Sequence, residues 1–118
     1  EFEQVEKDML IPASKFIFIS PEYNGSIPGV LKVMLDISDY KRVWWGKKAL
    51  LTGVATGRSG NLRGMEHLTG ILHYLRVFVH PNKLPLSSVD KLLNGEGVVA
   101  DSATANAIYA QVDEFIQF

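Results

Sequence analysis

Two short apolar runs, each followed by a turn-rich loop and then by a helical pattern, constrain the fold of this chain more than any other feature. The runs are residues 15–19 (KFIFI) and residues 49–54 (ALLTGV). Neither alternates strictly between apolar and polar residues, which is typical of strands buried on both faces of a parallel sheet. Strands that alternate with helices imply right-handed crossovers and helices on both sides of the sheet. We therefore predict an α/β fold.

Helical spacing of apolar residues predicts two helices around the first strand. The first covers residues 1–11 and ends at Pro12. Its expected inner face consists of Phe2, Val5, Met9 and Leu10. Ser26 can cap the second helix, which runs to about residue 39 and has Pro28 in its first turn. No cap residue precedes Phe2, so the first helix is expected to begin in its middle, as if cut from a longer chain.

The second half of the chain repeats this alternation. We expect a helix at residues 65–74, a short strand at residues 77–79 and an irregular segment at residues 82–97. Asp101 or Ser102 caps a last helix. The expected inner face of that helix consists of Ala105, Ile108, Tyr109, Val112, Phe115 and Ile116. The predicted order is helix, strand, helix, strand, helix, strand, helix.

Composition excludes several classes of function. A chain of 118 residues is long enough for one compact domain, so residues 1–118 are expected to form a single domain. No apolar run approaches the roughly 20 residues that a membrane span requires. The net charge of −1 provides no basic surface for nucleic acid or an anionic membrane. The chain has no cysteine, which removes disulfides and thiolate chemistry and fits a reducing compartment. We expect a cytoplasmic protein.

Two loops are the candidate binding site. Residues 20–29 (SPEYNGSIPG) follow the first strand, and residues 55–61 (ATGRSGN) follow the second. In open α/β sheets, ligands bind beyond the carboxyl ends of the strands, where loops meet helix N-termini. Each loop combines glycines, which permit close approach of the backbone, with exposed amides at the start of a helix. The two loops are expected to form one site.

The string Pro21-Glu22-Tyr23-Asn24-Gly25-Ser26, with residues 28–32 (PGVLK) and Asp36 after it, resembles the signature of NAD(P)H-dependent FMN reductases. These flavodoxin-like flavoproteins include azo-dye and quinone reductases. Residues 56–61, 67–75 (HLTGILHYL), 79–85 (VHPNKLP) and the final helix follow in that family's order, so the resemblance covers essentially the whole chain. It implies a flavodoxin-like three-layer sandwich with a parallel sheet.

The resemblance also implies which residues hold FMN. They are Pro21, Glu22, Tyr23, Asn24, Gly25, Ser26, Thr56, Gly57, Arg58, Ser59 and Gly60. Backbone amides around Tyr23 and Asn24 would face the carbonyl oxygens and imide nitrogen of the isoalloxazine ring. Tyr23 would border the ring, and Ser26 would cap the helix behind it. Asn24-Gly25 supplies a turn with positive φ, and the prolines fix the chain on either side.

The chain departs from the family pattern in two places. The family often has two adjacent glycines where this sequence has Gly60 followed by Asn61, a residue that tolerates the left-handed region. The family's first strand and phosphate-binding loop have no counterpart before Glu1. We therefore expect an N-terminally truncated portion, the C-terminal two-thirds of the family's domain. Such a chain alone would hold FMN weakly or not at all, because a phosphate dianion needs several convergent donors.

The resemblance implies an enzyme in which NAD(P)H donates hydride to FMN. The reduced flavin then passes electrons to a small-molecule acceptor such as a quinone, an azo compound or free flavin. No side chain is assigned as a catalytic acid or base. The family commonly assembles, which favours a homodimer or homotetramer. Two alternatives are a flavodoxin-type electron carrier, which takes no hydride from a nicotinamide, and a truncated, cofactor-free interaction domain.

Some residues have two interpretations from the sequence. Arg58 can reach a phosphate of the cofactor or the nicotinamide, or it is a solvated loop residue. Trp44 and Trp45 pack on the sheet edge or anchor a subunit interface. Glu22, in a turn near a helix, is assigned a structural role. The three histidines lack ligand spacing, so no metal site is predicted.

Overall fold

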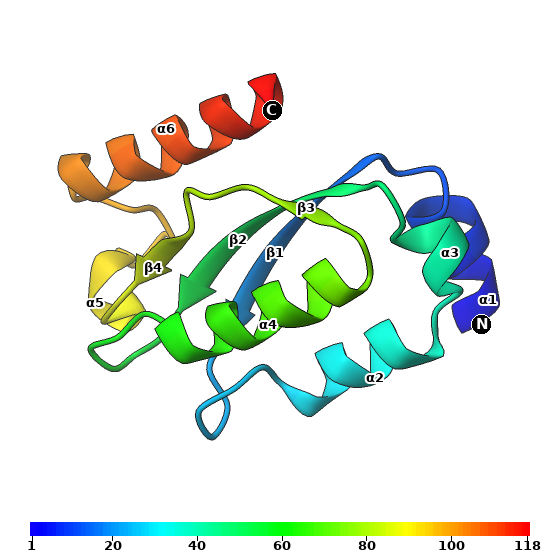
Figure 1. Cartoon of the computed structure of the whole chain (residues 1–118). Helices are drawn as coiled ribbons and strands as arrows, with labels where there is room; N and C mark the ends of the chain where they lie inside the picture. The colour runs from blue at the N-terminus through cyan, green and yellow to red at the C-terminus, as the bar shows by residue number, and fades with distance from the viewer.

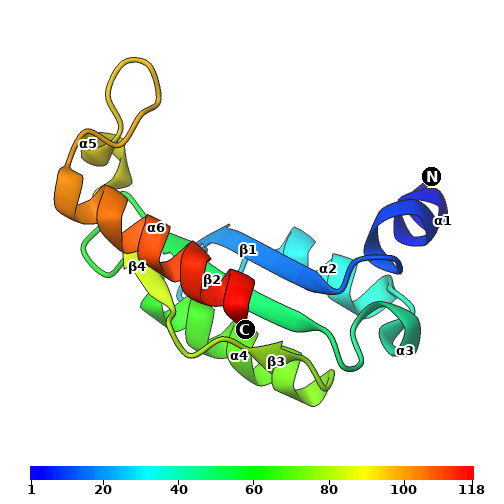
Figure 2. The same cartoon turned by 90° about the horizontal axis from the view of Figure 1, so that it is seen from above.

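The computed structural model describes residues 1–118 and has three layers, with a parallel sheet in the middle (Figure 1). The strands are β1 (Lys15–Pro21), β2 (Lys48–Val54), β3 (Phe78–Val79) and β4 (Leu84–Leu86). One face is covered by α2 (Gly29–Ile37) and α4 (Leu62–Tyr74), and α6 (Ser102–Gln117) lies on the other (Figures 1 and 2). Shorter helical segments are α1 (Phe2–Val5), the π-helix η1 (Glu6–Leu10), α3 (Tyr40–Val43) and α5 (Val89–Leu92). The predicted α/β sandwich is confirmed.

Strand β2 lies at the centre of the sheet. It pairs in parallel with β1 along its whole length, from Lys15 opposite Lys48 to Pro21 opposite Val54. On its other side it pairs in parallel first with β3 and then with β4, whose Leu86 lies opposite Val54. Because all these strands run in the same direction, the loops that follow β1, β2 and β4 leave from one edge of the sheet.

The hydrophobic core lies between the sheet and the helices α2 and α4. Its centre is the indole of Trp44, which is buried and packs on Phe16 and Phe18 of β1, with ring centroids 4.9 and 6.2 Å away. The indole N–H donates to the Ser38 hydroxyl at 2.7 Å, so the buried polar end of the ring is paired. Trp44 therefore packs on the sheet, which was one of its two interpretations.

Helix α6 buries Phe115 and makes several polar contacts with the sheet. The buried Gln111 donates to the carbonyls of Leu51 and Asn82, each at 2.9 Å, and accepts from the Thr52 hydroxyl at 2.8 Å. Lys15 donates to two carbonyls in the last turn of the helix. Asp101 caps the first turn, as predicted, and its hydrogen bonds from the Thr104 hydroxyl and amide lower the pKa of its carboxyl.

The structure corrects the expected burial of β1. Phe16 and Phe18 pack against the core, but Ile17 and Ile19 on the opposite face are exposed. The reason is geometric: β1 is an edge strand, and α6 extends over β2 and β4 rather than over β1 (Figure 2). Burial on both faces holds for β2, whose residues 49–53 are all buried.

Two connections contain more structure than the sequence predicted. The segment 82–97, expected to be irregular, includes β4 and α5. A three-residue strand with Pro85 at its centre has no readable periodicity, and it exists because β2 offers it a partner. The connection between α2 and β2, for which no helix was predicted, contains α3, which begins where the Asp39 carboxylate accepts from the Arg42 amide.

The predicted inner faces of the two terminal helical segments are wrong in part. Val5 and Met9 are exposed, whereas Leu10 packs against the core as expected, together with Ile11. In α6, Tyr109 and Ile116 are exposed because the helix turns the polar Gln111 toward the sheet. None of the helices combines the length and the apolar character needed to cross a bilayer.

Candidate functional site

The two loops selected from the sequence lie side by side at the carboxyl edge of the sheet. They follow Pro21 and Val54, which are paired neighbours in the β1–β2 ladder. A cavity of about 460 Å³ lies between them. It is lined by Pro21, Glu22, Tyr23, Val54, Ala55, Thr56, Gly57, Arg58, Ser59, Asn61 and Val89. Both loops therefore line the same cavity, as the prediction of one shared site requires.

The first loop forms a tight turn around Asn24 and Gly25. Their φ angles are +52° and +81°, the pair of positive values that a type I′ turn requires. Two hydrogen bonds close the turn, from the Tyr23 amide to the Ser26 carbonyl at 2.9 Å and from the Ser26 amide to the Tyr23 carbonyl at 3.2 Å. The amides of Asn24 and Gly25 donate to no backbone carbonyl. The Tyr23 side chain is exposed at the rim of the cavity.

The glycine loop is held through its carbonyl groups. The amides of Ser88 and Val89 donate to the carbonyls of Gly57 and Ala55, at 3.0 and 2.9 Å, and the Ser87 hydroxyl donates to the Arg58 carbonyl. None of the N–H groups of residues 56–61 donates to a backbone carbonyl. The loop therefore presents free donors directly before the N-terminus of α4, where the helix dipole also favours an electron-rich group.

Gly53 and Gly60 allow β2 and the glycine loop to pack without side chains between them. A Cβ atom on Gly53 would lie 2.2 Å from the Gly60 carbonyl oxygen. Gly60 has φ +56°, and a Cβ atom there would lie 2.7 Å from backbone atoms of Pro85 and Leu86. Gly57, in the same loop, has no neighbour within 4 Å of such an atom. Close backbone contact, and not flexibility alone, requires glycine at positions 53 and 60.

The predicted residues divide into those that line the cavity and those that shape the loops. Pro21 to Tyr23 and Thr56 to Ser59 line it, whereas Asn24, Gly25 and Gly60 supply backbone conformation. The capping role expected for Ser26 is wrong. Helix α2 begins at Gly29, with Pro28 at the N-cap position and no side-chain cap. The Ser26 hydroxyl instead lies 2.8 Å from Nδ1 of His67 on α4.

The sequence interpretation missed three lining residues and the role of a fourth. Val54 is the last residue of β2, and Ala55 opens the candidate loop 55–61 but was not among the predicted cofactor-binding residues. Val89 belongs to the β4–α5 segment that was expected to be irregular. A third parallel strand ends at the same edge, so its following loop must also reach the site. The Ser87-Ser88 pair after Leu84–Leu86 is the signal that could have located that loop. Asn61 is the fourth residue: in the sequence it stands out only because the family often has a glycine at this position, and no role was predicted for its side chain.

The cavity fits a flat ring with polar edges better than it fits a phosphate. Val54, Ala55 and Val89 provide apolar contact, and the free N–H groups of the glycine loop match carbonyl and imide acceptors such as those of isoalloxazine. Arg58 is the one cationic side chain among the lining residues, and the Glu22 carboxylate is also among them. The donor set of this cavity therefore suits the flavin ring, and a phosphate dianion would need further donors.

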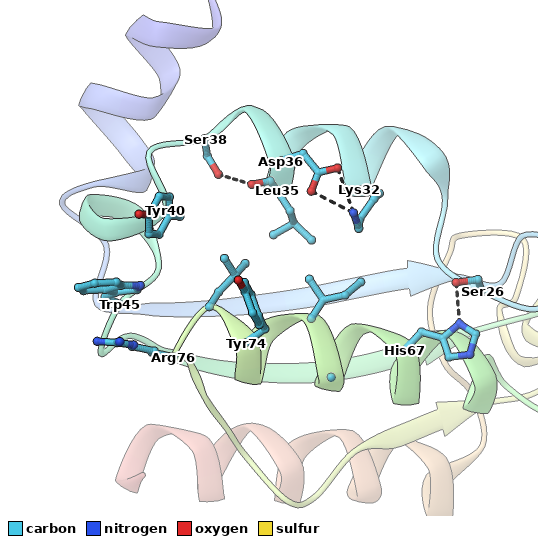
Figure 3. Close-up of a pocket in the computed structure, with 13 residues that line it drawn as sticks. Ser26, Lys32, Leu35, Asp36, Ser38, Tyr40, Trp45, His67, Tyr74 and Arg76 are labelled. Atoms are coloured by element: carbon cyan, nitrogen blue, oxygen red, sulfur yellow. Dashed lines mark hydrogen bonds and ion pairs between the residues drawn. The ribbon is translucent and has the colours of Figure 1, made fainter.

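A second and larger cavity, of about 1110 Å³, lies between α2, α3 and α4 (Figure 3). At one end the Arg76 guanidinium stacks on Trp45, with 4.1 Å from Cζ to the ring centroid. Lys32 and Asp36 form an ion pair at its wall. Of the predicted residues only Ser26 lines it. This groove is lined mainly by helix faces and, from the two loops, only by Ser26, whose amide is already paired with the Tyr23 carbonyl, so its size does not make it the candidate site.

Residues 6–91 match the family model described as NADPH-dependent FMN reductase. A 2-hydroxy-1,4-benzoquinone reductase from a Burkholderia species is 26% identical over 119 residues, covering 98% of this chain and 65% of that protein. An NAD(P)H-dependent FMN reductase from Pseudomonas aeruginosa is 31% identical over 111 residues, covering 90% of this chain and 59% of that protein.

Among solved structures, the fold is similar to that of FerB from Paracoccus denitrificans, a flavoenzyme NAD(P)H:(acceptor) oxidoreductase. The TM-score is 0.80 at 25% sequence identity, covering 98% of this chain and 65% of that chain. The chain thus spans less than two-thirds of the length of each of these three proteins.

Substituting Gly60→Ala should destabilise the fold by about 2–4 kcal/mol, because the side chain is strained at positive φ and collides with the backbone of β4. Gly57→Ala, in open space in the same loop, should change stability by less than about 0.5 kcal/mol. Urea unfolding followed by circular dichroism measures both. Equal effects would contradict the tight packing of this loop on β4.

Proposed function

The chain belongs to the NADPH-dependent FMN reductase family, and we propose that its two sheet-edge loops hold the isoalloxazine ring of FMN in a working flavin reductase. One observation carries this proposal: the β1–β2 register brings two loops with free backbone donors to the same cavity. FMN, when bound, supplies a ring that accepts hydride from NAD(P)H and passes electrons to a second acceptor. The protein supplies position and hydrogen bonds.

The proposed roles differ between the two loops. Pro21, Glu22 and Tyr23 border one edge of the ring, and the turn at Asn24 and Gly25 directs free amides toward its carbonyl and imide groups. Thr56, Gly57, Arg58 and Ser59 border the other side, and Gly60 fixes the end of their loop. Arg58 has no carboxylate partner within ion-pair distance, so its charge is available to a phosphate of the cofactor or the nicotinamide.

The electron acceptor is proposed to be a small molecule, with a quinone, an azo compound or free flavin as candidates. A quinone is favoured because one relative is named a benzoquinone reductase. A flavodoxin-type electron carrier would share the ring-binding loops but would not accept hydride from a nicotinamide. A cofactor-free interaction domain would leave the free amides of both loops without a ligand. The names of the relatives favour the reductase over both alternatives.

We further propose that the chain forms a homodimer or homotetramer through the outer face of α2. Val30, Val33 and Ile37 lie three and four residues apart along this helix and are 78%, 55% and 58% exposed. A further exposed apolar side chain is Tyr74 on α4, which is 88% exposed and borders the large groove (Figure 3). An exposed apolar stripe along one helix suits a second copy with the same surface. The absence of cysteine supports a cytoplasmic location.

Anaerobic mixing with NADPH distinguishes the reductase from its alternatives. The full-length protein loaded with FMN should lose its visible flavin absorbance promptly, because hydride transfer reduces the ring. Tyr23→Ala should weaken FMN binding about five- to tenfold by removing an aromatic contact. Tyr109→Ala, an exposed position on α6, is the matched control and should have no effect. Bound flavin that stays oxidised would indicate an electron carrier, and a protein that binds no FMN would indicate an interaction domain.

Sedimentation tests the proposed assembly. Val33→Glu places a charge within the apolar stripe of α2 and should shift the protein toward monomer, because burying an unpaired carboxylate is costly. Val98→Glu, which is 54% exposed in the loop before α6, should leave the assembly unchanged. A wild-type protein that is monomeric at micromolar concentration would refute the proposal directly.

A further inference from the structure

Asn61 links the glycine loop to the end of β1. Its side chain is 1% exposed, and its Nδ2 donates to the Ser20 carbonyl at 2.7 Å. Its φ of +66° is the left-handed conformation in which glycine or asparagine is favoured. Ser20 is the next-to-last residue of β1, close to the start of the first loop, and Asn61 ends the second loop. This one buried hydrogen bond thus links the end of β1, close to the first loop, to the last residue of the glycine loop.

The surrounding glycines make room for this side chain. A Cβ atom on Gly64, in the first turn of α4, would lie 2.0 Å from the Asn61 Oδ1 atom. A Cβ atom on Gly53, in β2, would lie 3.0 Å from the Asn61 Cβ atom. The amide therefore sits in a space left by two glycines on different elements. Its Oδ1 atom is buried and has no hydrogen-bond partner, so only the Nδ2 contact with Ser20 fixes its orientation.

A second contact ties the far end of the first loop to the same helix. The Ser26 hydroxyl lies 2.8 Å from Nδ1 of His67, which lies in the second turn of α4, after Asn61. The first loop is therefore attached at Ser20 and at Ser26 to residues at or near the start of α4. Because the glycine loop leads directly into α4, these attachments fix one loop relative to the other.

We propose that Asn61 is a positioning residue that sets the width of the cavity between the two loops by holding the first loop against the glycine loop. This inference rests on the proposed function of the two loops. The glycine that the family resemblance leads one to expect at this position has no side chain and cannot make the link. The hydrogen bond of Asn61 would then raise the affinity of the cavity for the flavin ring, and the fold would not depend on it.

Two substitutions separate the link from the backbone conformation. Asn61→Gly retains the preference for positive φ and removes the side chain, so the backbone is unstrained and the link is lost. Asn61→Asp retains the shape but places a carboxylate oxygen against the Ser20 carbonyl, so the contact becomes repulsive. Asn94→Gly, in the exposed loop before α6, is the control for loss of an asparagine side chain.

The test uses lumiflavin, which has the flavin ring without the phosphate chain, and FMN beside it. Asn61→Gly should weaken lumiflavin binding about three- to tenfold, the effect expected for one lost hydrogen bond. Asn61→Asp should weaken it further, and Asn94→Gly should not change it. At saturating ligand, the visible circular dichroism of the bound ring should differ between Asn61→Gly and wild type. A purely structural role would lower the melting temperature and leave that spectrum and the affinity unchanged.

Gly64→Ala provides an independent variant that acts through Asn61. The added methyl group displaces the amide from Ser20, so lumiflavin binding should weaken. In the Asn61→Gly background the same change should cost less, because the displaced group is absent. If wild type binds neither flavin, the proposed function fails and the positioning role fails with it. If wild type binds lumiflavin and Asn61→Gly matches it in affinity and spectrum, the positioning role alone is overturned.

Discussion

The parallel pairing of β1 with β2 is the constraint on which the rest of the molecule depends. Seven residue pairs, from Lys15–Lys48 to Pro21–Val54, bring both strands to an end at the same level. A slip of one residue would turn Phe16 and Phe18 away from Trp44 and remove the core contact that holds the edge strand. The same slip would also shift the end of β1 relative to the end of β2, where the two loops begin. Core packing and site geometry are therefore specified by a single register.

The site is built from backbone groups that the scaffold leaves unpaired. Segment β4–α5 braces the glycine loop by donating to its carbonyls, while the N–H groups of residues 56–61 remain free. The Asn24-Gly25 turn leaves two further amides without a backbone partner. Such preorganised donors suit a planar ring with acceptors on its edge, and they need no ionisable side chain in a special state. The larger groove between α2 and α4 has the Lys32–Asp36 ion pair at its wall and Arg76 stacked on Trp45 at one end, which is a different chemistry.

Local patterns in the sequence predicted the two long strands, the positive-φ turn and the location of both loops. Each depends on a few adjacent residues, such as Asn24-Gly25, whose conformational preferences are strong. Features that depend on distant partners were not predictable. Strand β4 forms only because it pairs with β2. The hydrogen bonds of Gln111 to Leu51 and Asn82 determine which face of α6 lies against the sheet. The role of Asn61 depends on its contact with Ser20, which is distant in the sequence. Exposure of Ile17 likewise depends on which helices lie over the sheet edge.

The central claim is that the smaller cleft, and not the larger groove, receives the flavin ring. Titration of ¹⁵N-labelled protein with lumiflavin, followed by amide chemical shifts, tests it most directly. The amides of residues 22–25 and 56–61 should shift together, while those of Lys32, Tyr74 and Arg76 in the groove should not. Shifts confined to the α2–α4 groove, or to only one of the two loops, would contradict it.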